Sequence, residues 1–175
     1  MEFNKLIVTI ENVKSNGYIE GNVEPARLRA SILTAQNVHL HNILGSALYD
    51  FYTTKIQDDG TLSGLSAVQT VFYEQYITPI ICSYSEVEYI AQFQLSNIGV
   101  TKSKNATNEP AELAEIKFAM GQAQNRADFY AQRAKEFICK EENKTELEIY
   151  YSASDQNISP DRKAFNSYIY LPSKR

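Results

Sequence analysis

The stretch from Glu24 to Tyr52 decides the fold of this chain; it reads EPARLRASILTAQNVHLHNILGSALYDFY. Pro25 suits the first turn of a helix, because its missing N–H would have no partner there. Steps of three and four residues place one side of this helix on a common face: Leu28, Ile32, Ala35, His39 and Ile43. Gly45 stands where a helix needs a left-handed residue to end, and Ser46 can cap a short second helix. The stretch therefore predicts a helical hairpin.

A second helical segment is predicted from Ser66 to the sequence Asn97-Ile98-Gly99, which ends it. The part of this segment from Ile81 to Ile98 is apolar around much of its girth, which indicates a central and largely buried helix. Pro79 lies within the segment and predicts a kink or a break near Thr78, because its ring clashes with the carbonyl four residues earlier.

Residues 100–110 are polar and are interpreted as a flexible loop. A long helix is predicted after them, from about Ala111 to Lys140. Its regular face consists of Leu113, Ile116, Met120, Ala123, Ala127, Tyr130, Ala134 and Phe137. Because three of these residues are alanine, we expect a neighbouring helix to approach closely. We expect that neighbour to lie in the same bundle, and an intermolecular coiled coil is the alternative.

Both ends of the chain look less regular. The run from Leu6 to Ile10 is β-branched and predicts a short strand, or alternatively a brief helical turn capped by Thr9. After residue 142, the alternation from Leu147 to Tyr151 is typical of a strand. Residues 152–167 are polar, and the chain then continues with the apolar sequence Tyr168-Ile169-Tyr170-Leu171-Pro172.

An apolar, tyrosine-rich segment of this kind would favour aggregation if it were left free in water, so we expect it to dock on the bundle or on a neighbouring subunit. Tyrosine is common on surfaces that contact other proteins. The residues predicted to form a subunit or partner interface are Tyr150, Tyr151, Tyr168, Ile169, Tyr170 and Leu171.

Taken together, these segments predict a mainly α-helical protein: a bundle of four to five helices, a short non-helical N-terminal segment and an extended C-terminal arm. The predicted division is a helical bundle domain of residues 1–142 and an arm of residues 143–175. A chain of 175 residues buries roughly 70% of its unfolded surface, enough for a core without metal or disulfide.

Composition narrows the function further. No signal peptide is visible at the start, and no run of 18 apolar residues is present, so we expect no membrane association. The net charge of −4, with both signs interspersed, argues against non-specific binding to duplex DNA. Cys82 and Cys139 lie in apolar helical stretches and are interpreted as reduced, buried thiols.

Motifs for catalysis are missing from the sequence. It contains no Gly-x-Ser-x-Gly nucleophile motif and no glycine cluster for binding phosphate. His39 and His41, two residues apart on a helix, point about 200° away from each other and cannot share a metal ion. We therefore predict no catalytic, cofactor-binding or metal-binding residues, and we do not expect an enzyme.

The opening helix pair resembles that of the head–tail connector (adaptor, or neck-ring) proteins of tailed bacteriophages, as found in phages of gut Bacteroidota. The matching residues are Ile32, Ala35-Gln36, Ile43-Leu44-Gly45 and Leu48-Tyr49, followed later by Asn97-Ile98-Gly99. The resemblance covers roughly residues 5–140.

This resemblance implies a structural virion protein with no cofactor, located in the phage neck at the head–tail interface and assembled in the cytoplasm of the bacterial host. Such proteins form a ring beneath the portal, commonly of twelve copies, that extends the DNA channel toward the tail. The implied partners are further copies of the chain, the portal protein, and tail or further neck proteins. DNA passes through the channel without sequence-specific binding.

A dimeric, all-helical DNA-binding regulator is the alternative. It would need a recognition helix rich in basic or amide side chains after a tight turn. Arg27 and Arg29 are the best candidates, but no helix precedes theirs. The connector interpretation is therefore preferred.

Overall fold

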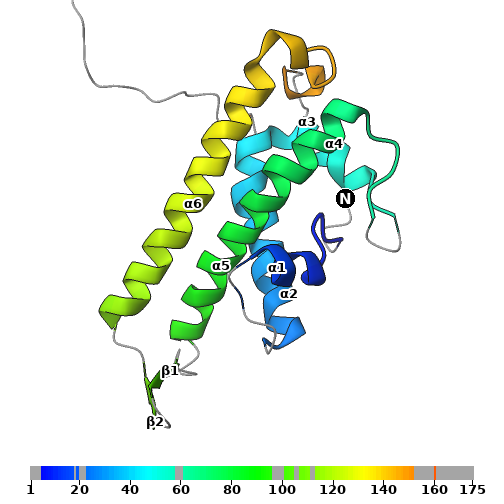
Figure 1. Cartoon of the computed structure of the whole chain (residues 1–175). Coiled ribbons are helices and arrows are strands. Elements are labelled where there is room, and N and C mark those ends of the chain that lie inside the picture. The colour runs from blue at the N-terminus through cyan, green and yellow to red at the C-terminus, as the bar shows by residue number, and fades with distance from the viewer. Residues whose placement is uncertain are drawn as a thin grey trace, which may run out of the picture.

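The computed structural model describes residues 5–17, 19, 23–57, 61–95, 101–104, 107–110, 113–151 and 160. Within these residues the chain is mainly helical, which confirms the predicted fold class, and one hydrophobic cluster forms the core. Figure 1 shows the helices in layers: α5 (Thr78–Leu95) lies between α6 (Leu113–Cys139) on one side and α2 (Pro25–Thr34) on the other.

The helix predicted to be central is largely buried over its first half. Ile80 and Ile81 of α5 are fully buried, and Tyr84 and Val87 on the following turns are at most 9% exposed. Apolar residues around most of the girth of a helix are what burial between two layers requires.

The N-terminal segment forms a short helix, α1 (Ile10–Asn16), and not a strand. Thr9 caps this helix, because its hydroxyl accepts a hydrogen bond from the Asn12 N–H at 3.2 Å. The capped turn was therefore the correct one of the two predictions. The strand was wrong, and so was the expectation that the N-terminal segment is non-helical.

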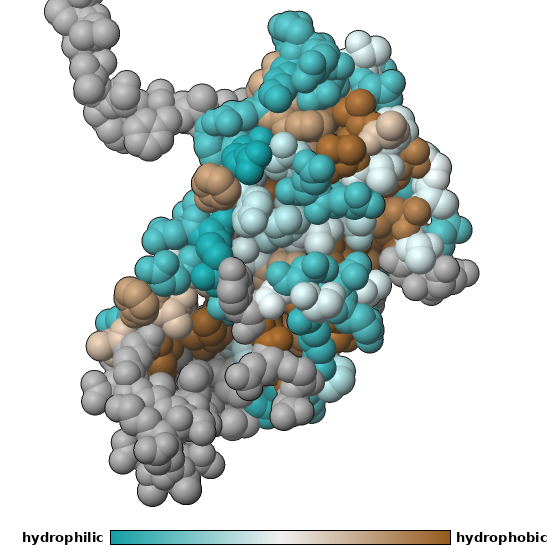
Figure 2. Space-filling model, viewed as in Figure 1, coloured by the Kyte–Doolittle hydropathy of each residue, from teal (hydrophilic) through white to brown (hydrophobic). Residues whose placement is uncertain are grey.

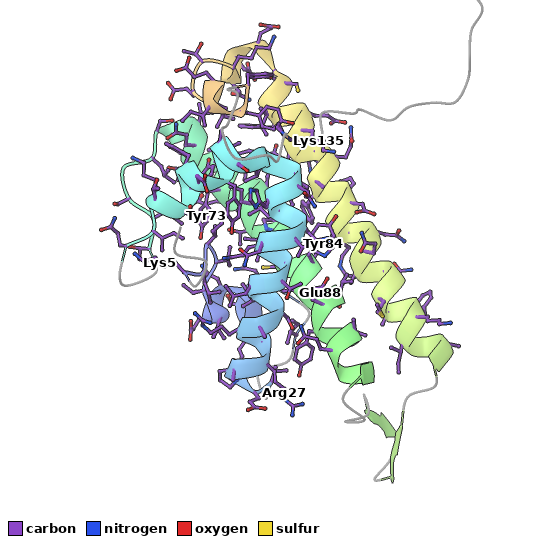
Figure 3. The ribbon with its side chains drawn as sticks, turned by 180° about the vertical axis from the view of Figure 1, so that it is seen from behind. Lys5, Arg27, Tyr73, Tyr84, Glu88 and Lys135 are labelled. Carbon is purple, nitrogen blue, oxygen red and sulfur yellow. The ribbon has the colours of Figure 1, made fainter. Side chains whose placement is uncertain are left out.

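Side chains explain why the buried residues before α1 need no partner strand. The N–H of Ile7 donates to Gln36 Oε1 at 3.0 Å, and its carbonyl accepts from the Tyr73 hydroxyl at 3.0 Å. Gln36 Nε2 also donates to the Lys5 carbonyl at 2.9 Å. Figure 3, seen from behind, labels Lys5 and Tyr73 on the same side of the molecule. Buried backbone groups are thus satisfied by side chains from two helical segments.

The segment from Glu24 to Tyr52 is helical and bends at Gly45, but the part after Gly45 does not pack back along α2, so the hairpin prediction was wrong. The segment contains two local departures from α-helix. The π-helical turn η1 (Ala35–Leu40) follows α2 directly, and the His41 N–H donates to the Gln36 carbonyl five residues earlier. Next comes α3 (His41–Thr54), which bends at Gly45, where φ is 73° and ψ is 163°. The predicted positive φ is confirmed, but the value of ψ shows an extended geometry and not a left-handed helical turn.

The segment that contains Pro79 stays continuous instead of breaking. It consists of α4 (Ala67–Phe72), the π-helical turn η2 (Tyr73–Ile77) and α5. In η2 the Thr78 N–H donates to the Tyr73 carbonyl five residues earlier. The helix therefore widens just before the proline, where an α-helical hydrogen bond has no donor.

Residues 101–110, predicted as a flexible loop, contain a two-stranded antiparallel ribbon. In it, β1 (Thr101–Lys104) pairs with β2 (Thr107–Pro110), with Thr101 opposite Pro110 and Lys104 opposite Thr107. The loop prediction was wrong for these residues, because a polar composition alone does not exclude backbone pairing.

The long helix α6 confirms the prediction made from its alanines. Ala123, Ala127 and Ala134 are fully buried, and α6 packs on α5 and η2. Small side chains on this face allow the two helices to approach closely.

The chain after α6 turns back onto the bundle in two short 3-10 helices, η3 (Glu141–Asn143) and η4 (Glu148–Tyr151). Leu147 is 0% exposed and Tyr150 is 1% exposed, and both belong to the core. The strand prediction for this segment was wrong: the step of three residues between these side chains is the repeat of a 3-10 helix. The first nine residues of the predicted arm, 143–151, therefore pack on the bundle, while most of residues 152–175 lie outside the described residues.

Candidate interaction surfaces

The structure separates the residues that were predicted to form an interface. Tyr150 is buried in the core of its own chain, so the interface prediction was wrong for its side chain. Tyr151 is 38% exposed, and its hydroxyl donates to the Ile138 carbonyl at 3.3 Å. Tyr168, Ile169, Tyr170 and Leu171 lie outside the described residues, and their interface role stays a prediction.

A surface that the sequence reasoning missed lies on the outer face of α6. Phe118 is 68% exposed and Phe129 is 56% exposed. The offset of eleven residues from one to the other corresponds to roughly 16 Å along the helix and to about 20° around it, so both side chains leave the helix on the same side. Gly121, between them, has no atom within 4 Å of the position that a Cβ would occupy. In Figure 2 separate apolar side chains stand among hydrophilic ones along the edge that α6 forms.

The side chains around Phe129 hold it in position without covering it. The Arg133 guanidinium lies 5.6 Å from the centre of the Phe129 ring and 5.9 Å from that of Tyr76. Tyr130 packs its ring edge-on against Phe129 at 5.5 Å. Cation–π and edge-to-face contacts fix the orientation of an aromatic ring while leaving its outer side exposed. The Phe129 ring is thus held in a fixed orientation on a mixed, partly polar outer face of α6.

A second exposed apolar side chain, Val38, lies on η1 and is 50% exposed. Its neighbour His39 faces α5 instead: the ring of His39 stacks on that of Tyr84 at 4.1 Å, and its Nε2 lies 2.8 Å from Glu88 Oε1. Tyr84 also contacts α6, because its hydroxyl donates a hydrogen bond to Asp128 Oδ1 at 2.8 Å. Figure 3 labels Tyr84 and Glu88 on α5. A polar network therefore joins η1, α5 and α6, and burial raises the pKa of Tyr84 within it.

The two histidines face different partners, as their spacing predicts. His41 is 8% exposed, its ring stacks on that of Tyr49 at 4.3 Å, and its Nε2 lies 2.8 Å from Ser46 Oγ. Burial lowers the pKa of His41, and the nearby Asp50 carboxylate opposes part of this shift. Over the described residues, no group of three or more His, Cys, Asp or Glu side chains is placed to hold a metal ion.

A polar cleft of about 570 Å³ opens between α1, η2, α5 and α6. Its lining consists of Asn12, Asn16, Gly17, Tyr73, Glu74, Thr78, Pro79, Cys82, Ser83, Glu86, Arg126 and Tyr130. The guanidinium of Arg126 pairs with the carboxylate of Glu86 across α6 and α5. Amide, hydroxyl and carboxylate groups of this kind suit water or a small polar molecule and not an apolar ligand.

The sequence contains a signal for the exposed phenylalanines of α6. Steps of three and four residues define the alanine face, and large apolar residues also occur opposite it. Phe118 and Phe129 lie on that opposite face at a helical spacing, and a large apolar residue opposite a packed face indicates a contact surface. Val38 gives no such signal, because single exposed apolar residues are common.

None of the described helices has the length and apolar character needed to cross a membrane.

Comparison with known proteins gives one match. No curated protein and no solved structure matches the chain. A family model does match residues 40–160, which is more than half of the chain and runs from the end of η1 to Pro160. The chain therefore belongs to DUF6712, a family of unknown function.

Proposed function

We propose that this protein is a structural virion protein that forms a ring in the phage neck, between portal and tail. The observation that carries the proposal is the exposed pair Phe118 and Phe129 on the outer face of α6. A head-to-tail contact needs a second, different surface, and we assign that role to the side of the molecule with Val38 on η1. The layer formed by α5 lies between these two elements.

Two different surfaces that meet head to tail generate a ring when the rotation between subunits closes, whereas one surface that meets itself gives a dimer. An apolar side chain that is half exposed or more loses its contact with water only when a partner covers it. We infer that the outer face of α6 in one subunit packs on the Val38 surface of the next subunit.

The remaining parts of the proposal rest on the resemblance to connector proteins. The resemblance implies that the ring contains about twelve copies and that it binds the portal protein and tail or further neck proteins. Tyr151 and the segment Tyr168–Leu171 add contacts with a neighbouring subunit or partner. DNA passes through the channel without sequence-specific binding, which is compatible with a net charge of −4.

The alternative, a DNA-binding regulator, was set aside because no helix was expected before the one with Arg27 and Arg29. That expectation was wrong, since α1 precedes α2. Its candidate residue Arg27 forms an ion pair with Glu24 at 2.9 Å. This pairing directs the guanidinium along its own helix.

The proposal is tested by measuring the mass of the protein by light scattering over a wide concentration range. We expect a closed assembly of about twelve subunits for the unchanged chain. The double variant Phe118→Ser/Phe129→Ser and the variant Val38→Ser should each remain monomeric, with unchanged melting temperatures because the altered side chains are exposed. Glu142→Ser, at an exposed position beyond α6, is the matched control and should assemble normally.

Mixing the two assembly-deficient variants distinguishes a ring from a dimer. Each variant retains one intact surface, so the mixture should form a heterodimer and nothing larger. A stable homodimer of Val38→Ser would contradict the head-to-tail contact. A salt-dependent affinity for duplex DNA together with such a dimer would favour the regulator.

A further inference from the structure

The kink of α3 at Gly45 is in contact with a residue from far along the chain, Pro160. A Cβ built on Gly45 would lie 2.5 Å from Pro160 Cδ, 2.7 Å from its backbone nitrogen and 3.1 Å from its Cβ. Real Cβ atoms essentially never come closer than 3.0 Å to such neighbours. The proline ring thus occupies the space that any other residue at position 45 would need.

Two separate demands therefore require glycine at this position. The first is the backbone, because φ is 73° and residues with a side chain rarely adopt this value. The second is the close approach of Pro160. Gly64 shows the first demand alone: its φ is 69°, but the nearest atom to its Cβ position is Lys55 Nζ at 3.4 Å, the end of a flexible side chain. The two glycines thus allow backbone strain and steric exclusion to be told apart.

The surroundings of the kink are rigid enough to form a defined docking site. Leu44 and Ser46, on either side of Gly45, are each 1% exposed. Ser46 Oγ lies 2.8 Å from Nε2 of His41, a hydrogen bond that spans the kink. A proline suits such a site, because its ring is apolar and its backbone nitrogen has no N–H that burial would leave without an acceptor.

We propose that the kink at Gly45 is a docking site for Pro160 of the same chain, and that this contact anchors the C-terminal part of the chain to α3. The proposal does not depend on ring formation. With Pro160 docked, the eight residues that follow reach at most roughly 27 Å, so Tyr168 stays within that distance of the kink. Without docking, the tether would begin at Tyr151, and its seventeen residues would reach roughly 58 Å.

Limited digestion with trypsin tests the anchor, because Arg162 and Lys163 lie two and three residues after Pro160 in the sequence. We expect Gly45→Ala and Pro160→Gly to raise the rate of cleavage at these residues roughly tenfold or more, the factor that corresponds to about 1.4 kcal/mol. Gly64→Ala, which has the same backbone demand but open space, should leave the rate unchanged. If Gly45→Ala fails to fold, Pro160→Gly still tests the contact, because it removes only a half-buried ring.

The double variant Gly45→Ala/Pro160→Gly completes the test. If both changes abolish one contact, their effects on the cleavage rate should not add, and the double variant should be cleaved no faster than the single variants. The proposal would be overturned if Gly45→Ala were cleaved no faster than Gly64→Ala. It would also be overturned if protection of the unchanged chain grew with protein concentration, because Pro160 would then dock on a different copy.

Discussion

The two cysteines differ in their surroundings although both lie in helices. Cys82 on α5 is 3% exposed, and burial raises the pKa of its thiol to about 12. Cys139 at the end of α6 is exposed, so the expectation of a buried thiol is confirmed for Cys82 and wrong for Cys139. Both thiols are free.

This contrast predicts selective alkylation. Because the thiolate is the reactive form, iodoacetamide at pH 8 should modify Cys139 and leave Cys82 unmodified in the folded protein. Mass spectrometry of the intact chain should show one added group, and two after unfolding in guanidinium. Cys139→Ser is the control and should show none under native conditions; modification of Cys82 in that variant would contradict its burial.

His41 predicts a pH dependence of stability. Its folded pKa is lowered by burial, so between the folded value and the unfolded value of about 6.5 the unfolded chain binds more protons. The stability linked to His41 is therefore complete above about pH 6.5 and is lost as the pH falls through the folded pKa, with a slope of at most about 1.4 kcal/mol per pH unit.

Urea unfolding at several pH values between 8 and 5 measures this slope. His41→Gln keeps a hydrogen-bonding group near Ser46 but does not titrate, so its free energy of unfolding should depend less on pH than that of the unchanged chain. An equal slope in both proteins would show that other groups carry the dependence.

At the scale of elements, α6 has a buried side that accepts only small side chains and an exposed side that has room for larger ones. Ala127, on the inner face, is fully buried, whereas Ala119 on the same helix is exposed. Leucine at position 127 has no room and should lower the free energy of unfolding by about 1–3 kcal/mol. The same change at position 119 is the matched control and should have little effect. Denaturant unfolding measures both, and equal effects would show that the helices do not approach as closely as the alanines indicate.

The sequence predicted those elements whose pattern extends over several turns. The alanine spacing of α6 and the apolar girth of α5 persist over many residues, so the choice between helix and strand was clear. The errors fell on short segments. Around Leu147 an alternation of only a few residues fits both a strand and a 3-10 helix, and the N-terminal run at Ile7 is satisfied by side chains that lie far away in sequence.

At the scale of the whole molecule, the end of the folded unit is testable by truncation. Removing residues 168–175 should leave the melting temperature nearly unchanged and abolish assembly, if Tyr168–Leu171 contact a partner. Removing residues 147–175 also deletes Leu147 and Tyr150, whose burial contributes at least about 3 kcal/mol. Such a loss is a large part of the 5–15 kcal/mol that a domain of this kind typically has.

Calorimetry and light scattering on both truncated chains check this expectation, and they also test the predicted domain division at residue 142. If the shorter chain melted like the unchanged protein, the bundle would end at α6 and the division would be supported. If removing residues 168–175 lowered the melting temperature strongly, the terminal segment would belong to the core.

The candidate surfaces were harder to predict from the sequence than the fold. Tyr150 and Tyr151 are adjacent and chemically identical, yet one is buried and the other is 38% exposed. Only the path of the chain after α6 decides which of the two tyrosines is buried. Pro160 lies in a polar stretch without periodicity, and nothing in the sequence connects it with Gly45.

The π-helical turns have a consequence for the lengths that this chain can tolerate. In an α-helix the loss of one residue rotates everything beyond it by about 100°, which would turn the buried face of a long helix toward water. A π-helical turn holds one residue more than an α-helical turn. At η1 and η2 a single residue can therefore be lost without rotating the helix on one side relative to the helix on the other. Related chains that differ by one residue are thus expected to place the difference within Ala35–Leu40 or Tyr73–Ile77, where a shorter helix would still fit the same bundle.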